Sequence, residues 1–170
     1  MVITYSKIVG ANVVELKTQS IVGQVSDLII QKTDLQISGM TLAKGFLDKN
    51  EKTISASDVV DLAPAAVVVR DQESISSLND NIRMKESYKD GYRGIYQRVE
   101  TRTGKKVGIV FDYLVESKTL SITKFYVRTL LTEKIIGSSS VVELRGKVLV
   151  IKDDFETARL VSPAIKASIV

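Results

Sequence analysis

The sequence carries an internal repeat, and this repeat constrains the fold more than any other feature. Residues 13–40 align with residues 98–125 without a gap, at an offset of 85 positions, and nine of the 28 aligned pairs are identical. The identical pairs are Val14/Val99, Glu15/Glu100, Thr18/Thr103, Val22/Val107, Gly23/Gly108, Val25/Val110, Asp27/Asp112, Leu35/Leu120 and Ile37/Ile122. After a three-residue gap, residues 57–62 realign with residues 139–144. Such self-similarity indicates a duplicated unit, so we predict two copies of one fold, joined near residues 74–92.

Each copy has the hydrophobic pattern of short β-strands. In the first copy, residues 22–30 begin with alternating apolar and polar side chains and end in a β-branched run, and residues 35–40 alternate again. Residues 107–115 and 120–127 repeat this hairpin in the second copy. Several short strands in a unit of about 80 residues are typical of a small barrel or sandwich. We therefore predict an all-β protein of two tandem small β-barrels with little helix.

Two segments have some helical character. Residues 74–88 contain helix-forming residues, and they fit either an interdomain helix or a plain loop. Residues 155–161 are predicted to form one or two helical turns, which Pro163 would end because proline cannot continue a helix. The predicted domains are a first barrel at residues 1–73, a connecting segment at 74–92, a second barrel at 93–155 and a C-terminal tail at 156–170.

The absence of two residue types excludes many classes of enzyme. The sequence contains no Cys and no His, which removes disulfide frameworks, thiolate metal sites, cysteine nucleophiles and the commonest general base. It contains no phosphate-binding glycine motif of the Walker or dinucleotide type. The Ser138-Ser139-Ser140 run has no base assigned to it and is interpreted as a polar turn. We therefore predict that the protein is not an enzyme and binds no metal and no cofactor.

The apolar segments are too short for a membrane span. The longest, residues 62–69, has eight residues, whereas a spanning helix needs about 20. The N-terminus has no uninterrupted apolar core of signal-peptide length. We expect a cytoplasmic protein without membrane insertion.

Two residue pairs recur at matching positions of the repeat. Gly23 and Gly108 would let a ligand approach the backbone, but glycine inside a strand more often marks a bulge. Asp27 and Asp112 would form a carboxylate pair for a cation, but an aspartate at a strand bend more often accepts hydrogen bonds from nearby backbone N–H groups. We predict the structural role for both pairs.

The positive charge is concentrated in one segment. Residues 82–106 hold eight basic and three acidic side chains, whereas the whole chain has a net charge of +4. Tyr88, Tyr92 and Tyr96 recur here among Lys and Arg residues, a combination that nucleic-acid surfaces use. Glycines in the segment argue against one continuous helix, and a connecting segment whose tyrosines pack on the second barrel, or a protein contact, fits the pattern as well. The candidate contact residues are Lys89, Tyr92, Arg93, Tyr96, Arg98, Arg102 and Lys105.

The repeated motifs resemble the PRC-barrel family. The family pattern runs from a G-x-V-x-D hairpin start through an I-P-x-x-D-V-like corner to a final apolar strand. The matching segments are residues 22–27, 54–60 and 66–69 in the first copy and residues 107–112, 137–142 and 148–150 in the second. Ser55 and Ser138 stand where the family has the corner Pro, and Ser140 stands where the first copy has Asp58. The resemblance is to stand-alone members with two copies, and it implies two tandem PRC-type β-barrels.

The resemblance also implies a function. Similar barrels lie on the cytoplasmic side of the photosynthetic reaction centre, in its H subunit, and others contact ribosomal protein in a ribosome maturation factor. We therefore predict a non-enzymatic cytoplasmic adaptor that binds protein partners. The alternative is a ribosome- or RNA-associated factor that uses the basic Tyr/Arg segment at residues 85–106. A homo-oligomer is a further alternative, because uncovered strand edges can pair between chains.

Overall fold

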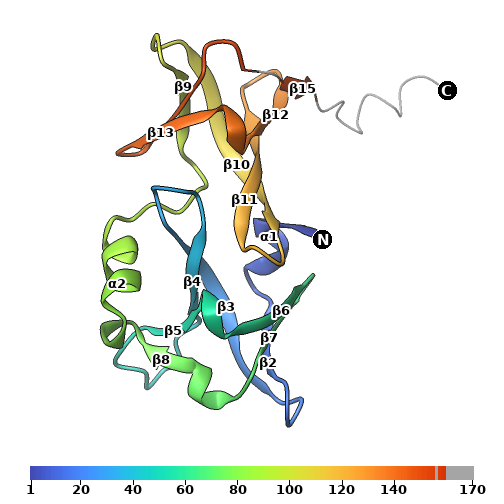
Figure 1. Ribbon diagram of the computed structural model, residues 1–170, viewed down its shortest axis with the longest axis vertical. Coiled ribbons are helices and arrows are strands. Elements are labelled where there is room, and N and C mark those ends of the chain that lie inside the picture. The colour runs from blue at the N-terminus through green and yellow to red at the C-terminus, as the bar shows by residue number, and fades with distance from the viewer. Residues whose placement is uncertain (156, 160–170) are drawn as a thin grey trace, which may run out of the picture. The chain divides into compact units, whose positions relative to one another are not determined.

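The protein is built mainly from β-strands, which confirms the predicted all-β class. A computed structural model describes residues 1–155 and 157–159 (Figure 1). The chain forms two compact units. Unit 1 contains Met1–Arg93 and Leu114–Ile122, and unit 2 contains Gly94–Tyr113 and the described residues from Thr123 onward.

Unit 1 contains a seven-stranded sheet. Its strands are β2 (Asn12–Glu15), β3 (Ile21–Ile30), β4 (Ile37–Leu42), β5 (Lys52–Ser55), β6 (Val59–Ala63), β7 (Ala66–Val69) and β8 (Ile75–Ser77). Strand β1 (Val2–Thr4) pairs with residues 114–116, which belong to the same unit, and the short helix α1 (Tyr5–Ile8) follows β1.

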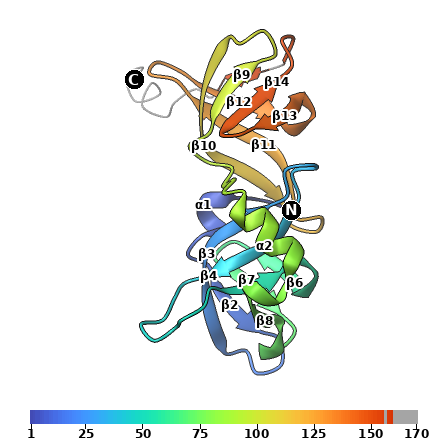
Figure 2. The same cartoon turned by 90° about the vertical axis from the view of Figure 1, so that its left-hand side faces the viewer.

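The strands of the second copy, together with β1, form the other sheet. They are β9 (Arg98–Thr101), β10 (Lys106–Glu116), β11 (Ser121–Arg128), β12 (Glu133–Gly137), β13 (Val141–Arg145), β14 (Val148–Ile151) and β15 (Thr157–Arg159). Figure 2 shows several of them from a second direction. The 3-10 turn η4 (Ser138–Ser140) precedes β13, as η1 (Ala56–Asp58) precedes β6.

Both copies have the same strand order, as the sequence repeat predicts. The order is β6-β7-β2-β3-β4-β5-β8 in one sheet and β13-β14-β9-β10-β11-β12-β15 in the other. Among the pairings that the described residues define, each sheet has one parallel pair of strands. This pair is β2 with β7 in the first copy and β9 with β14 in the second. Such a match along the whole path supports two copies of one fold.

In strands β2 and β9, the residues that are structurally equivalent differ by one position from those that the sequence alignment pairs. Arg98 pairs with Ile109 as Asn12 pairs with Gln24, so Asn12 is the equivalent of Arg98 at an offset of 86. The next strands, β3 and β10, keep the offset of 85. The β2–β3 connection is therefore one residue longer than the β9–β10 connection, and the ungapped alignment hides this insertion because valines and glutamates happen to coincide.

The repeated glycines and aspartates have the structural roles that were predicted. The β9–β10 register shifts between Lys106 and Gly108, which marks a bulge, and Gly108 has a φ of 153°. A Cβ on Gly108 would lie 2.7 Å from the carbonyl oxygen of Arg128. The carboxylate of Asp27 accepts a hydrogen bond from the N–H of Leu28 at 2.8 Å, and the carboxylate of Asp112 accepts one from the N–H of Tyr113 at 2.9 Å.

The segment after β7 belongs to unit 1 and contains a helix. It runs through the 3-10 turns η2 (Gln72–Ser74) and η3 (Leu78–Asp80) to helix α2 (Ile82–Lys89). Asn81 caps α2 by accepting the N–H of Met84 at 3.0 Å. The buried Met84 side chain packs with Ile29 and Leu78. Of the two alternatives for residues 74–88, the structure shows the helix, over their C-terminal half.

The helical turns predicted over residues 155–161 are wrong where the structure describes them. Residues 157–159 form β15, which pairs antiparallel with β12. The β12 edge offers backbone hydrogen bonds that a short isolated helix lacks. Residues 156, 160 and 161 lie outside the described part of the chain. Among the described residues, no helix has both the length and the apolar character that crossing a membrane requires.

Candidate partner-binding groove

Unit 2 carries an open apolar groove with a volume of about 560 Å³. Strands β9 and β10 supply most of its surface, and the end of β11 and the following loop supply one side. The side chains that matter for binding are those of Tyr96, Arg98, Glu100, Lys106, Ile109, Phe111, Arg128 and Leu130. We call this feature the unit-2 groove.

The bulge at Gly108 sets which side chains of β10 face the groove. Val107 and Val110 are buried in the unit, whereas Ile109 is exposed and Phe111 is half-buried. Side chains alternate between the two faces of a strand, and a bulge shifts this alternation by one residue. The strand therefore presents Ile109 and Phe111 to the groove while its valines pack in the core.

Arg128 is held over the aromatic part of the groove. Its guanidinium lies 4.2 Å from the centre of the Phe111 ring and forms an ion pair with Glu133 at 3.1 Å. The Phe111 ring in turn lies 6.0 Å from the Tyr126 ring. A guanidinium over an aromatic face is attracted by the ring quadrupole, so these contacts fix both the cation and the ring before any partner binds.

The charged side chains at the groove are mostly cationic. Arg98 and Lys106 are exposed, Arg128 is anchored as described, and Glu100 is the one acidic residue among the described lining residues. An apolar surface with a cationic rim attracts a ligand that combines apolar groups with negative charge.

Tyr96 has an unusual backbone conformation at the edge of the groove. Its φ is 58° and its side chain is 79% exposed. The Tyr96 N–H donates to Val110 at 2.7 Å, as the Gly10 N–H donates to Val25 at 2.8 Å, so the two residues are equivalent. The first copy thus places glycine where the second places a bulky aromatic residue. This left-handed conformation costs a non-glycine residue about 1 kcal/mol or more.

The two copies of the repeat differ at the positions that form the groove. These pairs, with the unit 1 residue first, are Gly10/Tyr96, Asn12/Arg98, Gln24/Ile109, Ser26/Phe111 and Ala43/Arg128. Each residue in unit 1 is small or polar, and each in unit 2 is apolar, aromatic or cationic. Because both copies have the same strand order, this topology does not depend on apolar, aromatic or cationic residues at these positions.

The structure places the seven candidate contact residues in both units. Lys89 is the last residue of α2 in unit 1. Arg93 is in the same unit, where its guanidinium forms an ion pair with Asp27 at 3.3 Å and lies over the Tyr88 ring. Tyr92 is buried, its hydroxyl has no hydrogen-bond partner among the described residues, and burial raises its pKa.

The remaining four candidates belong to unit 2. Tyr96 and Arg98 line the unit-2 groove, whereas Arg102 and Lys105 are exposed in the β9–β10 connection. The basic segment is therefore divided between the two units, and Tyr92 within it is buried. The structure adds Ile109, Phe111 and Arg128 to the site, and a comparison of the two copies at outward-facing positions would have identified all three.

No family model matches the chain, and no curated protein matches it.

Proposed function

We propose that the protein is a non-enzymatic cytoplasmic adaptor, built from two PRC-type barrels, that binds a protein partner through the unit-2 groove. The observation that carries the proposal is the difference between the copies. Unit 1 shows what this fold needs at the groove positions, and unit 2 departs from it toward exposed apolar and aromatic side chains. Such side chains on a folded surface mark interaction sites.

The groove has the chemistry for one class of partner segment. Ile109, Phe111 and Leu130 offer apolar contact, and Arg98 and Lys106 offer positive charge beside it. A segment with a large apolar side chain next to Asp or Glu satisfies both features. Contacts within unit 2 already hold Arg128 and Phe111 before binding. The protein therefore loses less conformational freedom when the segment docks.

A second candidate function is binding of single-stranded RNA. The exposed Tyr96 ring offers a stacking surface, and Arg98, Arg102 and Lys105 supply cations in the same unit. The aliphatic side chains of Ile109 and Leu130 favour a protein segment instead, because bases stack on aromatic rings and guanidinium groups rather than on aliphatic chains.

The proposal is tested by comparing two variants that each remove one exposed isoleucine. Ile109→Ser changes the groove, and Ile21→Ser is the matched control on β3 of unit 1, where the side chain is also exposed. Tagged wild type and both variants are used to capture partners from lysate of the source cell, at low and high salt and with nuclease. We expect a protein that wild type and Ile21→Ser capture equally and that Ile109→Ser captures much less.

Two results would count against the adaptor. Equal capture by all three proteins would show that the groove does not bind the partner. A complex that disappears with nuclease, and that weakens steeply with salt as phosphate contacts do, would favour the RNA candidate.

A further inference from the structure

The cations that line the unit-2 groove differ in how much acidic charge accompanies them. They are Arg98, Lys106 and Arg128, and Glu100 is the one acidic lining residue in the part of the chain that the structure describes. Arg128 is already paired with Glu133, at 3.1 Å. A partner can therefore meet uncompensated positive charge only at Arg98 or Lys106.

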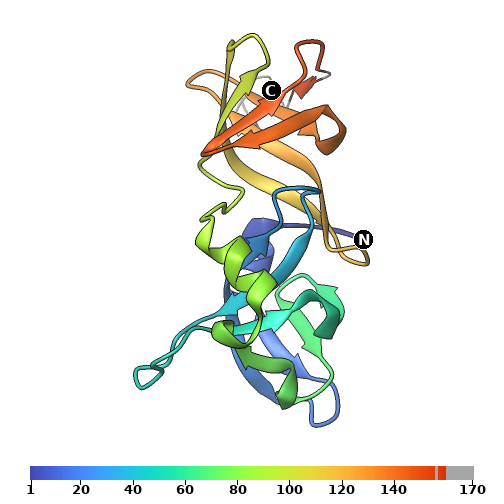
Figure 3. The same cartoon turned by 60° about the vertical axis from the view of Figure 1, so that its left-hand side comes forward.

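Lys106 lies opposite Glu100 in the hairpin of β9 and β10, which Figure 3 shows in yellow-green and yellow. The two residues are Cα partners in this antiparallel pairing. The Cβ atoms of such partners lie about 5 Å apart, whereas residues two positions apart along one strand are separated by about 7 Å. Glu100 is therefore nearer to Lys106, across the hairpin, than to Arg98 on its own strand.

The first copy of the repeat supports the pairing of Lys106 with Glu100. Val14 and Ile21 are the Cα partners at the equivalent positions of β2 and β3. An apolar pair in one copy thus corresponds to a pair of opposite charges in the other, and both members of the pair change together. Cross-strand pairs of either kind stabilise an antiparallel sheet. The charge of Lys106 is therefore offset within the hairpin.

Arg98 has no acidic residue opposite it. Its Cα partner is Ile109, and the equivalent pair in unit 1 is Asn12 with Gln24. The Arg98 side chain is exposed, and it forms no ion pair with any described residue. The change from Asn to Arg therefore adds a positive charge beside the exposed side chain of Ile109, while the nearby Glu100 faces Lys106.

We propose that Arg98 gives the unit-2 groove its preference for an acidic partner segment, by pairing with a carboxylate of that segment while an adjacent apolar side chain packs on Ile109. This inference rests on the proposed function, because it concerns the segment that the groove binds. A guanidinium offers two parallel N–H donors to one carboxylate, a geometry that suits recognition of an acidic group. Lys106 and Arg128 have acidic partners within the protein and are not needed for the preference.

Peptide binding to the full chain tests this preference. The probes are the peptide Ser-Gly-Leu-Phe-Glu-Gly-Ser, with both ends blocked, and the same peptide with Gln or Lys in place of Glu. NMR titration of the isotope-labelled protein gives the affinity of each peptide from the shifts of the groove amides. The measured quantity is the ratio of the affinities for the Glu peptide and the Lys peptide, because a uniform loss of affinity leaves this ratio unchanged.

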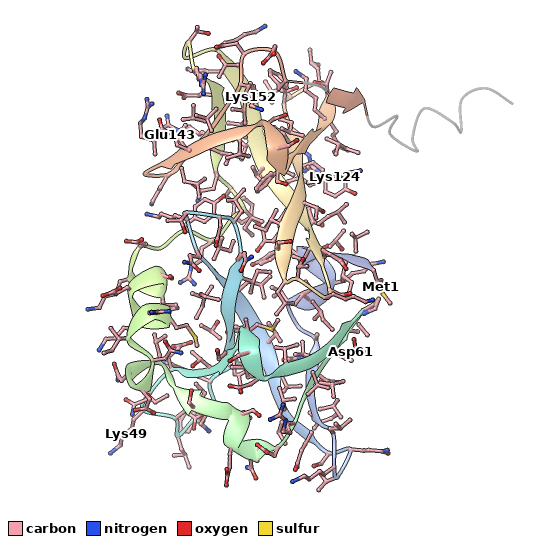
Figure 4. The ribbon with its side chains drawn as sticks, in the orientation of Figure 1. Met1, Lys49, Asp61, Lys124, Glu143 and Lys152 are labelled. Atoms are coloured by element: carbon pink, nitrogen blue, oxygen red, sulfur yellow. The ribbon has the colours of Figure 1, made fainter. Side chains whose placement is uncertain are left out.

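Three variants separate Arg98 from the other charges of unit 2. Arg98→Asn introduces the residue that unit 1 has at this position. Glu100→Val/Lys106→Ile replaces the charged pair with the apolar pair of unit 1 and leaves the net charge unchanged. Lys124→Gln removes an exposed cation of β11 that does not line the groove and that is labelled in Figure 4. Circular dichroism checks that each variant is folded.

We expect the wild type to bind the Glu peptide about fivefold more tightly than the Lys peptide. This ratio should fall to about one in Arg98→Asn and persist in the other two variants. The inference is overturned if the ratio persists in Arg98→Asn, or if either other variant lowers it as much. Equal binding of all three peptides by the wild type overturns this inference alone, whereas a wild type whose groove amides respond to none of them counts against the proposed function of the groove as well.

Discussion

Tyr96 holds a backbone conformation that the first copy of the repeat assigns to glycine. Residues in this conformation persist only where the surrounding structure imposes it, and here the hydrogen bond to Val110 does so. The side chain gains little burial in return, since it is 79% exposed. In our account, the strain is retained because it positions an aromatic ring at the edge of the groove.

This account predicts that Tyr96→Gly separates stability from binding. Glycine relieves the left-handed strain but adds freedom to the unfolded chain, so we expect the free energy of unfolding to stay equal or rise by up to about 1 kcal/mol. Capture of the protein partner should fall. Lys124→Gly, at an exposed position within β11, is the control and should lower stability by about 0.5–1 kcal/mol. Urea denaturation measures both, and a Tyr96→Gly variant that is less stable than Lys124→Gly would contradict the account.

Gly108 is required for a different reason. A side chain at this one position of β10 would collide with neighbouring atoms. A Cβ would lie 2.7 Å from both the Arg128 carbonyl oxygen and a Val127 methyl group. We expect Gly108→Ala to lower the free energy of unfolding by about 2 kcal/mol or more. Gly104→Ala is the matched control, because Gly104 also has a positive φ but nothing lies within 4 Å of its Cβ position. Equal losses in the two variants would show that strain alone, and not close packing, explains the glycine.

At the scale of elements, α2 belongs to the core of unit 1. Its Met84 side chain is buried against Ile29 and Leu78. The same side chain packs against β4 at Gly39, where an added Cβ would lie 2.7 Å from the Met84 sulfur. Met84→Ala should therefore lower the free energy of unfolding by about 2–4 kcal/mol. Ile82→Ala in the same helix, where the side chain faces solvent, should change it by less than about 0.5 kcal/mol. Thermal denaturation compares the stabilities of the two variants. Equally small losses for Met84→Ala and Ile82→Ala would mean that α2 is only a connector.

The turn in the β4–β5 connection of unit 1 makes a prediction about pH. The ion pair with Lys52 and the N–H of Gly45 hold the pKa of the Asp48 carboxyl below its ordinary value. A carboxylate with a lowered pKa contributes its stabilisation at neutral pH and loses it only as the pH falls through the lowered pKa. The turn at residues 45–48, in which the Asp48 N–H donates to the Gly45 carbonyl, should therefore persist to a lower pH than a turn closed by an Asp with an ordinary pKa. An NMR titration should show that Lys52→Ala raises the Asp48 pKa and that Lys49→Ala leaves it unchanged; no response to Lys52→Ala would contradict the assignment.

Much of the element structure could be predicted, and the failures have physical causes. The alternating pattern at residues 22–30 predicts β3 almost to its ends, because one face of that strand is buried. The one-residue insertion between β2 and β3 could not be found, because the ungapped register pairs Val14 with Val99 and Glu15 with Glu100, which makes it look better than the structural register. The local pattern at residues 155–161 predicts helix where β15 forms, because β15 is stabilised by pairing with β12, and a local pattern does not report a pairing with a separate segment.

At the scale of the whole molecule, duplication provides an internal reference. The repeat predicts two copies of one fold, and the common strand order confirms it. The groove was only partly predictable: Tyr96 and Arg98 were among the candidate residues, but the charge pattern that identified them also selected the buried Tyr92. Charge along the sequence does not report burial, whereas the substitution of Ser26 by Phe111 at an outward-facing position does report a change of surface.

We propose that the unit-2 groove holds a segment of a protein partner. The most direct test replaces Ile109 with the photocrosslinking residue benzoylphenylalanine in the source cell, with Ile21 replaced as the control. Irradiation followed by mass spectrometry identifies what lies within reach of each position. We expect a crosslink to a protein segment with apolar and acidic residues at position 109 and none at position 21. Crosslinks to RNA at position 109, or the same products from both positions, would contradict it.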